Sequence, residues 1–110
     1  MEYSIRFANV DDISQIMCFI NSYWKKNHIL GTNRELFEWQ YCSDKKVNMV
    51  IGLDDNQQIQ GVLGYIPYSN TEEKDFALSL WKVKEGTAFL GVKLLLFLLD
   101  NEPHRYMFCN

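Results

Sequence analysis

The chain has 110 residues, a formal net charge of −3 and 47% hydrophobic residues. This length is typical of one domain (residues 1–110) with a core of ordinary size, and the composition argues against disorder. The 11 lysines and arginines are scattered along the chain, so we do not expect a nucleic-acid partner, which would need a concentrated basic face.

The first two elements are a strand and a helix. Residues 3–7 alternate between apolar and polar side chains, which predicts a strand. Asn9 is a good helix N-cap, and Asp12 stands three residues later, where a carboxylate favours the start of a helix. Apolar residues at helical spacing over positions 13–24 then predict an amphipathic helix.

A second helix is predicted from Thr32, because Thr32 and Glu35 have the spacing of a capping box. It ends near Cys42. Residues 27–31, which include His28, are predicted as the loop between the two helices. Within the second helix Phe37 and Tyr41 are expected in the core, and Trp39 on another face.

Two strands and a turn follow. Residues 46–53 alternate and predict a strand, residues 54–56 carry the short polar side chains of a turn, and residues 59–68 return as a strand. Gly61 and Gly64 indicate a bulge or a close approach by another part of the chain. Pro67 should end the regular ladder, because it has no N–H to donate.

The last third of the chain begins with a polar loop, residues 69–74. A strand (76–83), a turn around Gly86 (84–87), an apolar helix (88–100) and a final strand (105–109) follow. The helix is apolar almost all round, which predicts that most of its sides are covered. The element order β-α-α-β-β-β-α-β predicts an α/β (α+β) domain with a mixed, mostly antiparallel sheet flanked by helices.

This order resembles the first two-thirds of the fold of GNAT N-acetyltransferases. The resemblance is sharpest over residues 80–96, where a strand runs through a turn into a leucine-rich helix. In that family the helix opens with R-x-x-G-x-G/A. Gly91 matches this pattern, whereas Ala88 stands at the basic position and Lys93 at the last, small position.

The resemblance implies an acyl-CoA-dependent N-acetyltransferase, or its cofactor-binding part, with acetyl-CoA as co-substrate. It implies a small amine as acceptor, for which an amino sugar is one candidate. The cytoplasmic location that we expect comes instead from the cysteines, which are odd in number and far apart. The resemblance also implies a domain that is incomplete at its C-terminus, without the family's last helix and strands. An exposed sheet edge there would favour a homodimer.

The expected cofactor site combines the end of the strand 76–83 with the start of the helix 88–100. Backbone N–H groups in the first turn of a helix have no partner within it, and they favour a phosphate. The free backbone at the end of the strand can pair with an extended pantetheine arm. The expected contact residues are Trp81, Lys82, Val83, Phe89, Leu90, Gly91, Val92 and Lys93.

The sequence does not identify a catalytic residue. Glu72, Glu73, Asp75 and His28 are candidate bases, but each lies in or beside a polar loop, where a solvated or structural role is the more common one. A metal site is not expected, since the histidines and cysteines lack zinc-ligand spacing. The three cysteines are expected to be reduced and mostly buried.

No apolar signal segment opens the chain, and the most apolar stretch, residues 87–99, is too short for a bilayer. A membrane partner is therefore not expected. A different class stays open as an alternative: a non-enzymatic, PAS-like sensor or interaction domain. The two hypotheses differ over residues 81–99, where an acetyltransferase needs a long helix and a PAS-type domain would place strands.

Overall fold

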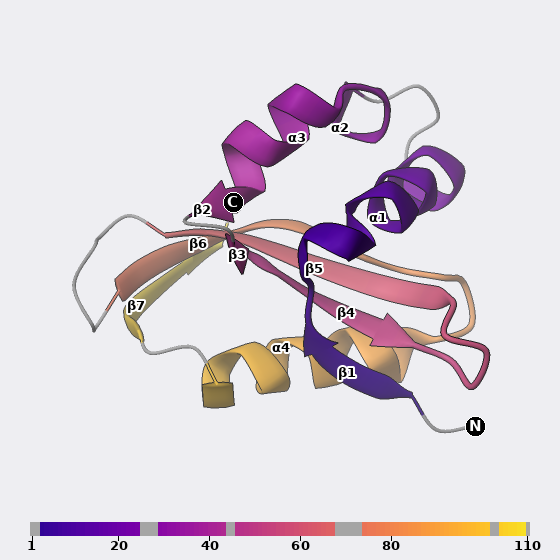
Figure 1. Cartoon of the computed structure of the whole chain (residues 1–110). Coiled ribbons are helices and arrows are strands. Elements are labelled where there is room, and N and C mark those ends of the chain that lie inside the picture. Colours follow the sequence, from indigo (N-terminus) through magenta and orange to yellow (C-terminus); the bar gives the residue numbers. More distant parts are fainter. Residues whose placement is uncertain (1–2, 25–28, 44–45, 68–73, 102–103, 110) are drawn as a thin grey trace.

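The computed structural model describes residues 3–24, 29–43, 46–67, 74–101 and 104–109. A five-stranded sheet with strand order β1-β4-β5-β6-β7 forms its centre (Figure 1). Helix α4 covers one face of this sheet, and the helices of the first half of the chain cover the other. The strands are β1 (Ser4–Phe7), β4 (Met49–Leu53), β5 (Ile59–Pro67), β6 (Lys74–Val83) and β7 (His104–Cys109), and the helices are α1 (Ile13–Phe19), α2 (Ile29–Thr32), α3 (Arg34–Tyr41) and α4 (Ala88–Asn101).

The topology agrees with the predicted mixed sheet. The pairs β1–β4, β4–β5 and β5–β6 are antiparallel, and α4 carries the chain from β6 to its parallel neighbour β7. The long helix that distinguishes the two functional hypotheses is therefore present directly after β6. A PAS-type arrangement, with strands over this segment, is not what the chain forms.

The predicted start of the first helix is confirmed. The Asn9 side chain accepts a hydrogen bond from the Asp11 amide, and the Asp12 carboxylate accepts one from the Asn9 amide at 2.9 Å. The helix opens with a 3-10 turn (Val10–Asp12), continues as α1 and widens into a π-helix, η2 (Ile20–Trp24). Arg6 donates two hydrogen bonds to Asp12, at 2.7 and 2.9 Å, and this contact lowers the pKa of the carboxyl group.

The predicted start of the second helix is wrong by one residue. Asn33 caps α3, because its side chain accepts a hydrogen bond from the Leu36 amide. Thr32 cannot serve as the cap, since it is the last residue of the one-turn helix α2. That turn also replaces the end of the predicted loop 27–31, of which residues 27 and 28 lie outside the described residues.

The predicted strand 46–53 is two strands. Asn48 interrupts it and donates its backbone N–H to the Tyr41 carbonyl at 2.6 Å. Before the break, β3 (Lys46–Val47) pairs with β2 (Cys42–Ser43) in a small separate sheet. After it, all five residues of β4 are buried, because helices cover both faces of the main sheet.

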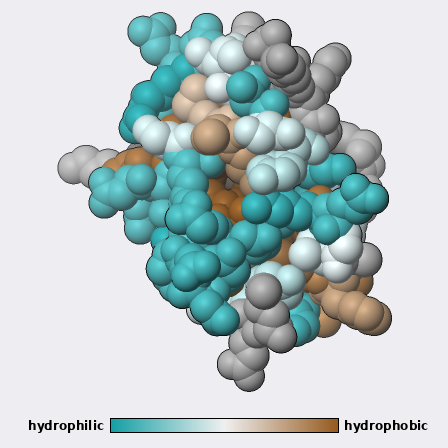
Figure 2. All heavy atoms as spheres, turned by 90° about the vertical axis from the view of Figure 1, so that its right-hand side faces the viewer, coloured by the Kyte–Doolittle hydropathy of each residue, from teal (hydrophilic) through white to brown (hydrophobic). Residues whose placement is uncertain are grey.

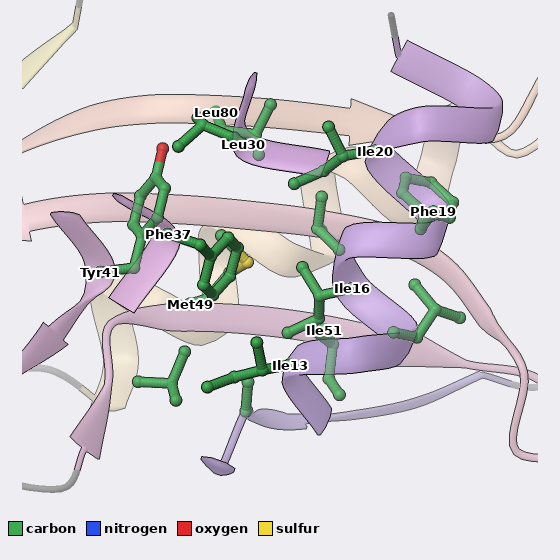
Figure 3. Close-up of a cluster of buried hydrophobic side chains, with 14 of the residues drawn as sticks. Ile13, Ile16, Phe19, Ile20, Leu30, Phe37, Tyr41, Met49, Ile51 and Leu80 are labelled. Atoms are coloured by element: carbon green, nitrogen blue, oxygen red, sulfur yellow. The ribbon is translucent and has the colours of Figure 1, made fainter. Parts of the chain in front are cut away.

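Two apolar clusters fill the molecule, one on each face of the sheet. The cluster under α1–α3 includes the predicted core residues Phe37 and Tyr41 (Figure 3). Trp39 is 80% exposed, as predicted. The cluster under α4 is built on three leucines one turn apart, Leu90, Leu94 and Leu98.

Two burial predictions are wrong. The outer side of α4 is open, with Phe89 85% exposed and Val92 and Leu96 each 53% exposed, because the sheet contacts only the opposite side of the helix. Cys18 is exposed on α1, and Cys42 is partly buried, so burial raises the pKa of the Cys42 thiol. The side chain of Cys109 lies outside the described residues.

Candidate functional site

Strand β6 has a stretch of free edge. Its parallel ladder with β7 begins at Lys74 paired with His104 and extends to Leu78 paired with Cys109. On the other side, β6 stays paired with β5 as far as Val83. Within the described part of the chain, residues 79–83 therefore have no strand partner on the β7 side, and their backbone groups on that side are free to pair with an extended ligand.

A β-bulge lies where this free edge begins. Leu80 pairs with Gly64 and Leu78 pairs with Tyr65, so Ser79 is an extra residue on β6. The expected bulge near Gly64 is thereby confirmed. The side chain of Leu78 packs in the cluster under α4, whereas the side chains of Ser79 and Leu80 both lie on the opposite face of the sheet, which α3 covers.

Ser79 belongs to a hydrogen-bonded cluster with two residues at the end of α3. Its hydroxyl oxygen lies 2.9 Å from the Tyr41 hydroxyl oxygen, and the Gln40 side-chain amide donates to Tyr41 at 3.3 Å and to Ser79 at 3.4 Å. Figure 3 shows the Tyr41 hydroxyl extending from α3 toward the strand that carries Leu80. Burial raises the pKa of Tyr41.

Gly64 makes this contact possible. A Cβ at Gly64 would lie 2.8 Å from Cε1 of Tyr41, so the tyrosine ring lies directly against the backbone of β5. The ring thus passes over β5 to bring its hydroxyl to β6. Sequence reasoning missed the Gln40–Tyr41–Ser79 cluster, because the two halves of the cluster are 38 residues apart in the sequence.

The turn predicted around Gly86 connects β6 to α4. Gly86 has φ +86°, a left-handed value that glycine adopts without strain. Thr87 precedes the first residue of α4, and its hydroxyl donates to the Lys84 carbonyl while its own carbonyl accepts from the Leu90 amide at 2.9 Å. Hydrogen bonds within the turn therefore hold its conformation, and α4 begins close to the end of β6.

Trp81 joins the strand to the helix. Its indole N–H donates to the Gly91 carbonyl at 3.1 Å, and the side chain remains 46% exposed. Gly91 is buried beneath it, since a Cβ there would lie 3.4 Å from the indole nitrogen. The two predicted halves of the site, the end of β6 and the first turns of α4, are thus in direct contact.

The start of α4 borders a hollow of about 410 Å³. It is lined by Tyr3, Gly86, Thr87, Phe89, Leu90 and Lys93. The turn is therefore open to solvent on this side rather than packed under other side chains. None of Trp81, Lys82 and Val83 lines this hollow, so the hollow and the free edge of β6 are two separate features at the same helix start.

The predicted contact residues differ in what they present. The side chain of Leu90 is buried against the sheet and its amide bonds to Thr87, so Leu90 offers no free donor. Phe89, Val92 and Lys93 are exposed on the first turns of α4, and Lys82 and Val83 are partly buried at the end of β6. Of the candidate bases, His28, Glu72 and Glu73 lie outside the described residues, and of Asp75 only its place in β6 is described.

A second, smaller hollow of about 190 Å³ lies on the α1 side of the sheet, on the face toward the β4–β5 turn. Figure 2 shows hydrophobic residues in the middle of this face, surrounded by hydrophilic ones. Lys84 reaches across from the end of β6, with its ammonium nitrogen 4.6 Å from the centre of the Tyr23 ring. The lining residues are Gln15, Cys18, Phe19, Ser22, Tyr23, Gln58, Ile59 and Lys84.

Two other kinds of site were sought over the same ranges. Among the residues that the structure describes, no group of three or more histidine, cysteine or acidic side chains is placed to hold a metal ion. No described helix has both the length and the apolar character needed to cross a bilayer.

Known structures share this fold. Over its whole length the chain is similar to an aminoglycoside acetyltransferase from an uncultured soil metagenomic sample, with a TM-score of 0.70 at 14% identity and 80% of that chain covered. The aminoglycoside 6'-N-acetyltransferase of Acinetobacter baumannii gives 0.71 at 11% identity, over 99% of this chain and 79% of that one.

A GNAT family N-acetyltransferase of Escherichia coli, solved in complex with CoA, gives a TM-score of 0.67 at 17% identity, over 91% of this chain and 56% of that one. No protein-family model and no curated protein matches the sequence. At these identities the likeness establishes the fold, and the fold is that of the GNAT N-acetyltransferases. The resemblance inferred from residues 80–96 is thereby confirmed at the level of the fold.

Proposed function

We propose that this chain is an acyl-CoA-dependent N-acetyltransferase domain that binds acetyl-CoA along the free edge of β6 and at the start of α4. The observation that carries the proposal is the unpaired edge of residues 79–83, which the turn at Gly86 connects to the start of α4. An extended ligand with peptide-like groups at one end and phosphates at the other fits this combination.

The lengths agree. The pantetheine arm of CoA contains two amide groups, and in its backbone atoms it is about as long as four extended residues, roughly 13 Å. From Ser79 to Val83 the strand advances by four residues, which is also about 13 Å. An arm paired with this edge, with its phosphate end at Val83, therefore places its sulfur beside Ser79.

The pyrophosphate would lie at the first turn of α4. Amides at a helix start without acceptors within the helix attract anions, and Lys93 adds an exposed positive charge on the same turns. In this arrangement Trp81 would lie between the arm and the helix, since its indole N–H donates a hydrogen bond to the Gly91 carbonyl of α4. Leu90 contributes to the site by packing, since its side chain anchors α4 to the sheet.

The acceptor in this proposal is a small amine. Two of the structural neighbours are aminoglycoside acetyltransferases, and this supports an amino sugar as the first acceptor to test. Acetyl transfer requires the amine to lose a proton, and the described residues do not identify the base. A homodimer through the edge strand β7 and a cytoplasmic location stay predictions.

Thermal unfolding with and without acetyl-CoA tests the proposal. At a hundred times its dissociation constant, a ligand that binds only the folded state adds about 2.7 kcal/mol of apparent stability. For a domain of this size that raises the melting temperature by roughly 10 °C. An unchanged melting temperature at millimolar acetyl-CoA would refute binding.

A pair of lysine variants locates the ligand. Lys93→Gln removes a charge at the start of α4 and should reduce the shift, whereas Lys46→Gln removes an exposed lysine from β3, away from the start of α4 (Figure 1), and should not. Equal shifts in the two variants would place the phosphates elsewhere. Release of free CoA thiol in the presence of an amino sugar would then report transfer.

A further inference from the structure

The bulge residue Ser79 belongs to a polar cluster whose central member, Tyr41, is buried and whose other two members, Gln40 and Ser79, are partly exposed. The cluster lies where β6 parts from β7, one residue beyond the last pair of the ladder. A hydrogen-bonding group at this position faces the space into which the end of a paired ligand would extend.

The hydrogen-bond count leaves one proton to spare. The two hydroxyl groups share one hydrogen bond, which uses one of their two protons, and the Gln40 amide donates to both oxygens. The phenol is the more acidic hydroxyl, so it is the better donor to Ser79. Among the side chains that the structure describes, the Ser79 proton then has no acceptor, and Ser79 is the member of the cluster that lies on the free edge of β6.

Packing holds this arrangement in place. The Tyr41 ring rests against the Gly64 backbone, with no room even for a methyl group, and Met49 closes the same space. The tyrosine hydroxyl therefore has little freedom to move away from Ser79. A donor held in this way loses little conformational freedom when a ligand binds.

We infer that the Ser79 hydroxyl donates a hydrogen bond to the thioester carbonyl of acetyl-CoA, and that Tyr41 and Gln40 position it. This assignment rests on the proposed function, since it takes the pantetheine arm to lie along residues 79–83. The arm's length places the thioester at Ser79. Free CoA has no carbonyl at that position, so Ser79 distinguishes the acylated cofactor from the free one.

Calorimetric titration of the whole chain with acetyl-CoA and, separately, with CoA tests the assignment. Ser79→Ala should weaken acetyl-CoA binding by about 3- to 10-fold, the range of one net hydrogen bond, and leave CoA binding unchanged. Tyr41→Phe keeps the ring over Gly64 and removes its hydroxyl, so it should shift the same ratio in the same direction by a smaller factor. Ser4→Ala, at an exposed strand position in β1, serves as the matched control.

The outcomes separate this assignment from the proposed function. If the unaltered chain binds neither ligand, the proposed function fails, and the role of Ser79 fails with it. If it binds both and Ser79→Ala weakens both equally, the residue acts on the shape of β6 and the assignment is wrong. It is equally wrong if Ser79→Ala leaves both dissociation constants unchanged.

Discussion

Replacing Gly64 by alanine tests the close packing of the Tyr41 ring against β5. The added Cβ would lie 2.8 Å from Cε1 of Tyr41 and 3.1 Å from Cε of Met49. Carbon atoms in favourable contact are about 3.5–4.0 Å apart, so the tyrosine ring has to move by roughly 0.7 Å or more. The ring is completely buried, and crowding of this kind in a packed core costs about 1–3 kcal/mol.

Urea denaturation of Gly64→Ala measures that destabilisation, with Gly91→Ala as the control. At Gly91 the nearest atoms to the new Cβ are the Trp81 indole nitrogen at 3.4 Å and a Val83 methyl carbon at 3.7 Å, which are ordinary contact distances. Alanine is also the better helix former by up to about 1 kcal/mol. Gly64→Ala should therefore lose stability, whereas Gly91→Ala should keep or gain it. A Gly64→Ala variant as stable as the original chain would refute the close packing of Tyr41 against β5.

Two further variants probe the helix start and the second core. Asp12→Ala removes the capping carboxylate and the partner of Arg6 and should cost about 1–2 kcal/mol at pH 7. Arg6 lowers the pKa of Asp12 in the folded state, so the stabilisation by Asp12 is present above the pKa of the unfolded chain and is lost as pH falls through the pKa of the folded chain. Denaturation at pH 7 and pH 2 should therefore show that the stability difference between Asp12→Ala and the original chain closes below about pH 4. Leu94→Ala empties the centre of the cluster under α4 and should cost about 2–5 kcal/mol; a loss under 1 kcal/mol in urea would contradict the burial of that side chain.

Features set by neighbouring residues were predictable from the sequence. The Asn9–Asp12 capping box, the turn around Gly86 and the order of the main strands and helices all follow from local chemistry and periodicity. The second helix shows the limit of this reasoning. Thr32 and Asn33 are both good caps, and only the short helix α2, which ends at Thr32, decides between them.

Features set by distant contacts were not predictable. The break at Asn48 depends on its bond to the Tyr41 carbonyl, and an alternating pattern gives no sign of it. Both Gly61 and Gly64 lie at a shift in strand register, as expected, but the side chains that pack against them, Val83 at Gly61 and Tyr41 at Gly64, come from distant parts of the chain. The predicted cofactor residues lie together at the junction of β6 and α4, but Ser79, which the site adds, is identified only by its contact with α3.

The central claim is that the free edge of β6 binds the pantetheine arm, and amide chemical shifts measured during a titration with acetyl-CoA test it most directly. We expect the largest changes over residues 79–83 and in the first turns of α4. Changes confined to the hollow beside Tyr23 and Lys84, or no changes at millimolar ligand, would contradict the account.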